Sequence, residues 1–107
     1  MGYSIYLEID TGAGNMAQCG EIGGMTYNVS PMYVKAVGNT LSSFNGMDAS
    51  ESIPALVAGV AAMESDPEAY RAMNPPNGWG DYEVALDYLR KLLKACQDHP
   101  LARIVVL

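Results

Sequence analysis

The strongest hydrophobic pattern in the chain is an apolar stripe at helical spacing between residues 81 and 98. Its members recur every three or four residues, as on one face of an amphipathic helix. They are Tyr82, Ala85, Leu86, Leu89, Leu92, Leu93 and Cys96. Asp81 stands at the expected N-cap, and Pro100 prevents the helix from continuing. The pattern predicts a long helix packed on the core, with Asp87 and Lys91 as an i,i+4 ion pair on its exposed side.

Alternation with a period of two residues marks a strand at the start of the chain. Between residues 3 and 10 every second residue is apolar, which predicts a strand with one buried face. The β-branched run at residues 102–107 predicts another strand, paired with the first. Residues 11–24 hold five glycines and predict a loop with at most a short strand near residues 16–22. Residues 25–29 predict a further strand.

Three more helices are predicted from their start signals. Ser30-Pro31 and Asp66-Pro67 each place an N-cap residue before a proline at the first helical position. Gly38 ends the first of these helices, and the other ends near residue 74. Ser50 is the expected N-cap of the remaining helix, with Pro54 in its first turn. The apolar stripe expected on that helix consists of Ile53, Leu56, Val57, Val60 and Met63.

Length and composition fit a single domain, residues 1–107. Half of the 107 residues are apolar or aromatic, which is enough for a core that needs no disulfide or metal. The predicted elements form an α+β fold. We expect a small antiparallel sheet of three or four strands packed against three or four helices.

The charge pattern narrows the range of partners. Twelve acidic and six basic residues give a net charge of −6, which disfavours nucleic acid and membrane surfaces and favours a basic protein partner. Residues 1–70 hold eight carboxylates and one cation, Lys35. A solubilising surface explains this imbalance, and so does an anionic face that meets a nucleic-acid-binding groove. The two cysteines and the lack of a signal-peptide or membrane-spanning pattern predict a cytoplasmic protein with reduced thiols.

Two motifs near the N-terminus have catalytic or cofactor-binding interpretations. Asp10-Thr11-Gly12 after an apolar strand is typical of retroviral-type aspartic proteases, but that fold is almost wholly β and its second motif is missing here. The run from Gly12 to Ala17 fits the loose dinucleotide pattern GxGxxG/A. That pattern needs a following helix, which the glycines at residues 20–24 do not favour. A glycine-rich loop explains both motifs better.

A Cys–His pair is the remaining catalytic alternative. Cys96 and His99 are three residues apart, but Cys96 falls on the apolar stripe, where a thiol is inert. His99 is expected to cap the helix C-terminus, and one histidine with two distant cysteines is a poor zinc site. We therefore expect no enzyme activity, no metal and no cofactor.

Trp79 stands between two glycines and has two interpretations. A tryptophan in a Pro/Gly loop is a candidate anchor for a partner, because tryptophan is enriched at binding hot spots. It is also a candidate core residue beneath the Pro75-Pro76 turn, because tryptophan is mostly buried in folded proteins. The second interpretation is the one we favour from the sequence.

Several segments together resemble a family of small phage and prophage proteins. They are MTYNVSPM (residues 25–32), ESDPEAY (64–70), NPPNGWGDY (74–82) and DHP (98–100). The chain is also similar to an anti-CRISPR of the type I-C class. This resemblance implies an inhibitor that binds the large subunit of the crRNA-guided effector complex at its PAM- and DNA-binding region. It implies a monomer in the host cytoplasm that blocks target DNA binding, partly by acidic DNA mimicry.

Charge complementarity then suggests which residues meet the partner. The expected partner-binding carboxylates are Glu64, Asp66, Glu68, Asp81, Glu83 and Asp87. Glu8, Asp10 and Glu21 form the second choice. Two other functions remain open: a phage anti-defence protein with a different partner, and a minor phage structural or assembly protein that self-associates.

Overall fold

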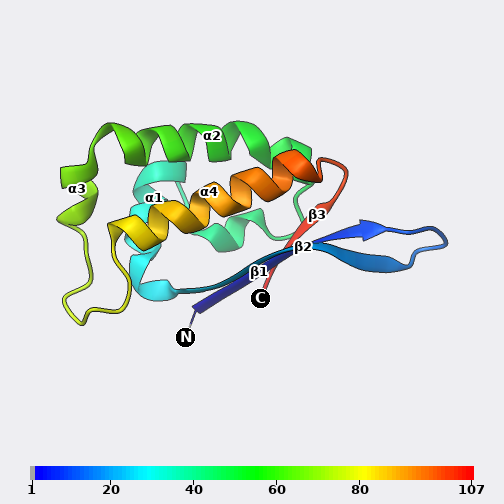
Figure 1. The fold of residues 1–107 in the computed structure, drawn as a ribbon, viewed down its shortest axis with the longest axis horizontal. Helices are drawn as coiled ribbons and strands as arrows, with labels where there is room; N and C mark the ends of the chain where they lie inside the picture. The colour runs from blue at the N-terminus through cyan, green and yellow to red at the C-terminus, as the bar shows by residue number, and fades with distance from the viewer. Residues whose placement is uncertain (1) are drawn as a thin grey trace.

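The computed structural model describes residues 2–107, which form a three-stranded antiparallel sheet and four α-helices (Figure 1). The chain runs through β1 (Gly2–Asp10), β2 (Met16–Thr26), α1 (Ser30–Val37), α2 (Ala49–Ser65), α3 (Pro67–Arg71), α4 (Tyr82–Asp98) and β3 (Arg103–Val106). Two short 3-10 helices, η1 (Tyr27–Val29) and η2 (Leu41–Phe44), flank α1. The α+β prediction is confirmed. Three or four strands and three or four helices were expected, and residues 2–107 form three strands and four α-helices.

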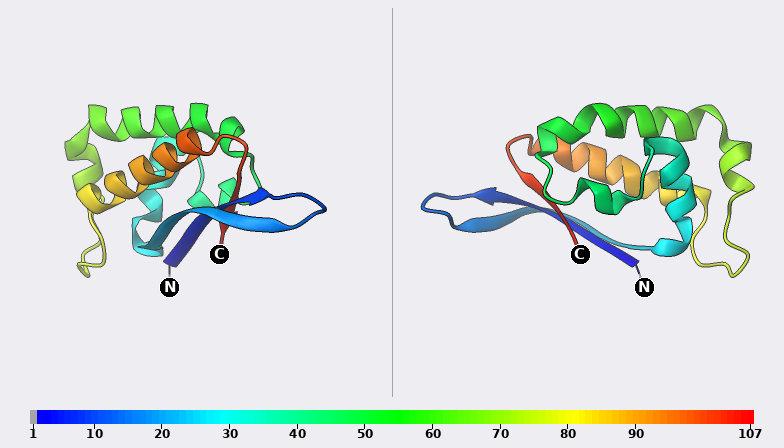
Figure 2. Two further views of the ribbon diagram at one scale, coloured as in Figure 1. Left: turned by 45° about the vertical axis from the view of Figure 1, so that its right-hand side comes forward. Right: turned by 180° about the vertical axis from the view of Figure 1, so that it is seen from behind.

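The sheet has the order β2-β1-β3, and both pairings are antiparallel. The predicted alternation in β1 is confirmed, because Tyr3, Ile5 and Leu7 are all buried. Figure 2 shows the helices on one side of the sheet, which is the side that these residues face. β3 pairs with residues 5–8 of β1, so the predicted pairing of the first and last strands is also confirmed.

The glycine-rich segment is where the strand prediction is wrong. Residues 16–26 form one continuous strand, and only residues 11–15 form the hairpin loop. The register of this strand shifts twice against β1, and Gly23 adopts a positive φ of 91° beside one of these bulges. The glycines therefore permit bulges within the strand, while ladder bonds to β1 supply the stability that their local propensity lacks. The predicted strand at residues 25–29 ends at Thr26, and η1 follows.

Two helices do not begin as predicted, and both starts carry hydrogen bonds to residues distant in the sequence. Ala49 and Ser50 at the start of α2 donate their N–H groups to the carbonyls of Ala102 and Pro100. The helix therefore begins without a side-chain cap, Ser50 is not the N-cap, and Pro54 lies beyond the first turn. Similarly, η1 runs straight into α1, and the Ser30 hydroxyl lies 2.6 Å from the Tyr3 hydroxyl instead of capping the helix.

Of the other helix signals, the stop at Gly38 and the cap at Asp66 are confirmed. Gly38 ends α1 in the left-handed conformation, and Asp66 caps α3, which ends at Arg71 rather than near residue 74. On α2, Val57 is exposed rather than buried, and Gly59 takes a buried place instead. A side chain at Gly59 would collide with Val37 of α1, so this glycine allows the two helices to approach closely.

α4 is the centre of the packing. It lies against α2 on one side and β2 on the other, and the predicted stripe is buried apart from the half-buried Leu93. Tyr88 joins the stripe and donates its hydroxyl to the Gly23 carbonyl at 2.7 Å. The predicted Asp87–Lys91 pair does not form, because Asp87 pairs with Arg90.

The β1–β2 hairpin projects from the body at the end remote from α3 (Figures 1 and 2). β3 covers the edge of β1 only as far as Glu8, so the tip of the hairpin consists of two strands alone. The resulting molecule is elongated, with principal extents of 48 × 26 × 18 Å. Within residues 2–107, no helix is long and apolar enough to cross a membrane.

Shortening a side chain at the centre of this packing should be costly. Leu89 is fully buried, and Leu89→Ala is expected to lower the free energy of unfolding by about 2–5 kcal/mol through lost burial and a new cavity. Val84→Ala on the same helix is the matched control, since Val84 is 46% exposed and should cost less than about 1 kcal/mol. Urea unfolding followed by circular dichroism measures both. Equal losses for the two variants would contradict the central role of the α4 stripe.

Candidate functional site

The six carboxylates expected to meet a partner lie together where α2, α3 and the first half of α4 join, and we call this region the acidic end. Two arginines connect its parts. Arg71 contacts Glu68 at 2.7 Å and Glu83 at 2.9 Å, so it links α3 to α4. Arg90 contacts Glu64 of α2 at 2.7 Å and Asp87 at 3.3 Å. The two groups that were separate in the sequence thus share one region of the surface.

The other two carboxylates of the acidic end are structural caps. Asp81 accepts a hydrogen bond from the Val84 N–H at 2.9 Å, as predicted for the N-cap of α4. Asp66 accepts a weaker one from the Ala69 N–H at 3.4 Å at the start of α3. Both negative charges lie at helix N-termini, where the helix dipole favours them. Replacing either one would lower the stability of its helix as well as remove a charge.

Buried tyrosines hold the acidic end in place. The Tyr82 ring stacks on the Tyr70 ring with centroids 6.1 Å apart, and the Arg71 guanidinium lies 5.1 Å from the Tyr82 centroid. The Tyr82 hydroxyl donates to the Met63 carbonyl at 2.7 Å. These contacts tie α2, α3 and α4 to one another. The exposed carboxylates are therefore attached to helices whose relative positions are fixed by buried contacts.

The acidic end remains strongly anionic despite its ion pairs. The side chains of Glu68, Glu83 and Asp87 are 84%, 58% and 69% exposed. Six carboxylates outnumber the four cations near this region, which are Arg71, Arg90, Lys35 beside the Tyr70 ring, and Lys91, which lines the same hollow as Asp87. Hydrogen bonds with Glu83 and Glu68 raise the pKa of Arg71, an arginine that is protonated at physiological pH in any case.

The second-choice carboxylates belong to the β1–β2 hairpin rather than to the helices. Glu8 is paired with Arg103 across the β1–β3 ladder. Asp10 sits at the hairpin turn, where it accepts a hydrogen bond from the Gly12 N–H at 2.8 Å. Glu21 lies on β2 beside α4. Each of these three carboxylates therefore has a local setting of its own.

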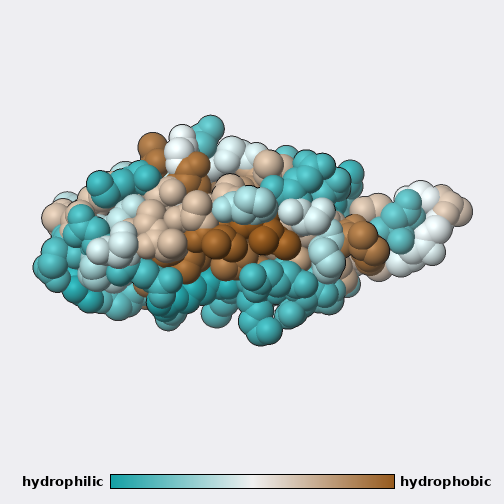
Figure 3. All heavy atoms as spheres, turned by 90° about the horizontal axis from the view of Figure 1, so that it is seen from above, coloured by the Kyte–Doolittle hydropathy of each residue, from teal (hydrophilic) through white to brown (hydrophobic). Residues whose placement is uncertain are grey.

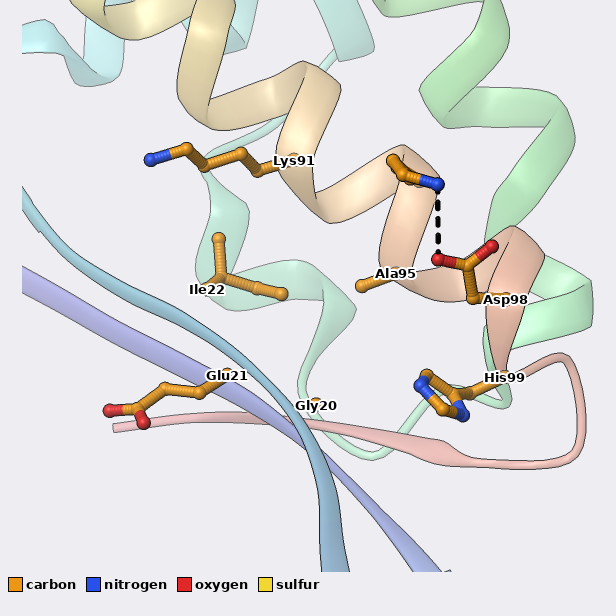
Figure 4. A pocket seen from close by; sticks show the side chains of 8 residues that line it. Gly20, Glu21, Ile22, Lys91, Ala95, Asp98 and His99 are labelled. Carbon is orange, nitrogen blue, oxygen red and sulfur yellow. Dashed lines mark hydrogen bonds and ion pairs between the residues drawn. The ribbon is translucent and has the colours of Figure 1, made fainter.

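A groove between β2 and α4 is a feature that sequence reasoning missed. Two adjoining hollows of about 240 and 300 Å³ share Ile22 and Lys91. Figure 4 shows Lys91 reaching over the first hollow, with Glu21 on the β2 side and His99 at the far end. Lys94 and Asp98 at its rim form an ion pair of 3.3 Å. The glycines of β2 lower the strand surface here, and no sequence motif marks such a hollow.

The catalytic alternatives find no support in the arrangement of their residues. Cys96 is buried, its sulfur lies 3.5 Å from the Ser52 hydroxyl, and burial raises the pKa of its thiol. His99 instead lines the groove, so the two residues are not paired. The glycines after Asp10 lead into β2 and not into a helix. Among residues 2–107, no three His, Cys, Asp or Glu side chains are grouped as metal ligands.

Trp79 is the residue for which the favoured interpretation is wrong. It is 65% exposed, whereas the core beneath the 74–80 loop is filled by Tyr82 and Val29. The two flanking glycines are the sequence feature from which the exposure of Trp79 could have been predicted. Gly78 and Gly80 both have positive φ, at 76° and 89°, and this backbone turns the tryptophan outward.

Thiol labelling tests the assignment of Cys96 as inert. We expect Ellman's reagent at mildly alkaline pH to modify Cys19, which is half-buried, in the native protein. Cys96 should react only after unfolding, because it is buried and burial raises its pKa. The variant Cys19→Ser serves as the control and should show no native-state labelling. Rapid reaction of this variant would reopen the Cys–His alternative.

Comparisons with known proteins identify no relative. No protein-family model, no functionally described protein and no solved structure matches the chain. The resemblance to phage proteins therefore remains an expectation. Function must be argued from the surface that the fold creates.

Proposed function

We propose that the protein acts by binding, and that its acidic end occupies a basic DNA-binding surface of a protein partner. The gathering of six carboxylates from α2, α3 and α4 at one end is the observation that carries this proposal. Such a surface attracts a Lys/Arg-lined groove and excludes DNA from it. No chemistry or cofactor is needed for this kind of inhibition.

Charge and preorganisation together favour binding of the acidic end to a cationic surface. Exposed carboxylates steer association with a cationic surface and raise the association rate, most strongly at low salt. The caps, the tyrosine stack and the arginine bridges hold these charges in place before binding, so little conformational entropy is lost on contact. A rigid anionic surface is a better competitor of DNA than a flexible acidic tail of equal charge.

The resemblance supplies the identity of the partner. An anti-CRISPR of the type I-C class would bind the crRNA-guided effector complex in the host cytoplasm. Effector proteins recognise the PAM and hold the duplex through Lys and Arg side chains. We propose that the acidic end meets this region of the large subunit and blocks target DNA binding. A different anti-defence target with a basic nucleic-acid-binding groove would use the same surface.

A second candidate function, in phage assembly, is favoured by a different face. Figure 3 views the molecule from the α2 side and shows an apolar band along it. α2 carries no charged side chain between Glu51 and Glu64, and Val57 is 47% exposed on it. A helix that is apolar all round is usually covered. Self-association through this face would produce oligomers whose abundance rises with protein concentration in light scattering.

A charge-neutralised variant tests the proposal. Glu64→Gln, Glu68→Gln, Glu83→Gln and Asp87→Asn together remove four charges and leave the caps Asp66 and Asp81 intact. The readout is a gel shift of PAM-containing duplex DNA by a purified type I-C effector complex, at low and high salt. The native protein should abolish the shift, and less effectively at high salt. The variant should need about tenfold more protein or above for the same effect.

The control removes four charges elsewhere: Asp10→Asn, Glu21→Gln, Glu51→Gln and Asp98→Asn. These positions lie on the hairpin, on β2 and at the ends of α2 and α4. The control should inhibit like the native protein. Equal loss in both variants would show that only the net charge matters. An unchanged DNA shift with the native protein would remove the type I-C assignment.

A further inference from the structure

The geometry points to Trp79 as the aromatic anchor of the partner contact, one that stacks on an arginine side chain of the partner's surface. This inference rests on the proposed function in placing the contact at the acidic end. It adds an aromatic residue in the loop between α3 and α4 and the kind of cation that fits it. Its test uses a simple peptide and does not depend on the effector complex.

The exposure of Trp79 is unusual for its residue type. Tryptophan is highly buried on average, yet this side chain is 65% exposed. It is also the single tryptophan of the chain. Within residues 2–107, its indole has no hydrogen-bond partner and no cation over its ring. Its faces are therefore free for a partner.

The exposure is built into the 74–80 loop. Asn74 accepts a hydrogen bond from the Tyr82 N–H at 2.9 Å, which fixes the end of the loop against α4. Inside the loop, the Gly78 N–H donates to the Pro75 carbonyl at 3.2 Å, and Asn77 accepts from the Trp79 N–H at 3.0 Å. Two prolines stiffen the entry. The loop thus presents the indole at low entropic cost.

Gly80 fixes the direction in which the indole points. Its φ is 89°, and a Cβ there would lie 2.8 Å from Val29 and 2.9 Å from Thr26. The backbone after Trp79 therefore lies close against η1, between its N-cap Thr26 and its last residue Val29, where only glycine fits. With this side of the loop occupied by protein, the tryptophan faces outward. Tyr27 on η1 is 40% exposed, and its ring packs edge-on against Tyr3 at a centroid distance of 4.7 Å.

The charges near the loop define the chemistry of the partner. Asp81 follows Trp79 by two residues, and Glu83 and Glu68 lie on the adjoining α4 and α3. An indole is the best aromatic partner for a cation, and the planar guanidinium of arginine stacks on it more readily than an ammonium group does. The carboxylates can then accept the guanidinium N–H groups. The same arrangement already exists inside the protein, where Arg71 lies over Tyr82 and pairs with Glu83.

A fluorescence titration with a hexa-arginine peptide tests the inference. Trp79 alone supplies the indole emission, so the signal reports on the loop directly. We expect a saturable change in emission that weakens with added salt, and weaker binding of hexa-lysine by about threefold or more. The absence of a saturable change would overturn the inference. Equal affinity for both peptides would also overturn it, because it would show charge attraction without stacking.

Calorimetric titration of variants separates the indole from the charge around it. Trp79→Ala should weaken hexa-arginine binding about tenfold. The affinity of Trp79→Phe should lie between those of the native protein and Trp79→Ala. Val84→Ala is the control, because it shortens another exposed apolar side chain on the first turn of α4. Trp79 and Val84 are both exposed, so all three variants are expected to fold. Native affinity in Trp79→Ala would refute the anchor role.

The gel-shift assay distinguishes this inference from the proposed function. If Trp79→Ala loses both peptide binding and inhibition of the effector, both stand. If hexa-arginine binding depends on Trp79 but the native protein does not inhibit the effector, the effector assignment fails and the anchor remains. If Trp79→Ala inhibits like the native protein, the anchor role fails while the charge-based function stands.

Discussion

Leu89 and Leu92 of α4 are fully buried between α2 and the sheet, and the rest of the structure depends on this burial. A three-stranded sheet with one projecting hairpin has little stability of its own, and α2 lacks a side-chain cap. Both gain their stability from the apolar stripe of α4, whose burial removes a large hydrophobic area from water. α4 contacts α2, α3 and β2, so its stripe connects both layers of the core.

The same packing creates the acidic end. Tyr82, at the start of α4, contacts Met63 of α2 and Tyr70 of α3, and so sets the distances over which Arg71 and Arg90 can reach. Each exposed ion pair contributes little to stability by itself. The ion pairs of Arg71 and Arg90 instead position carboxylates from three helices on one surface. The positions of these solvent-exposed charges therefore depend on the packing of the buried core.

The two ends of the molecule have opposite physical characters. The hairpin end is a two-stranded projection that has few neighbours. The other end combines a rigid loop, an exposed indole and a dense group of carboxylates on a supported base. Binding energy is gained where a surface is preorganised and large side chains can be desolvated. This contrast is the physical reason for proposing the acidic end, together with Trp79 in the adjoining loop, as the partner-binding surface.

The sequence by itself determined the elements that local rules govern. The period of the α4 stripe, the alternation in β1, the caps Asp66 and Asp81 and the stop at Gly38 all follow from short-range physics. Tertiary structure decided the rest. Ladder bonds to β1 made a strand of the glycine-rich segment, and carbonyls near the C-terminus replaced the cap of α2. Whether Trp79 is buried and which carboxylates meet depend on contacts between distant residues, and no local pattern records those.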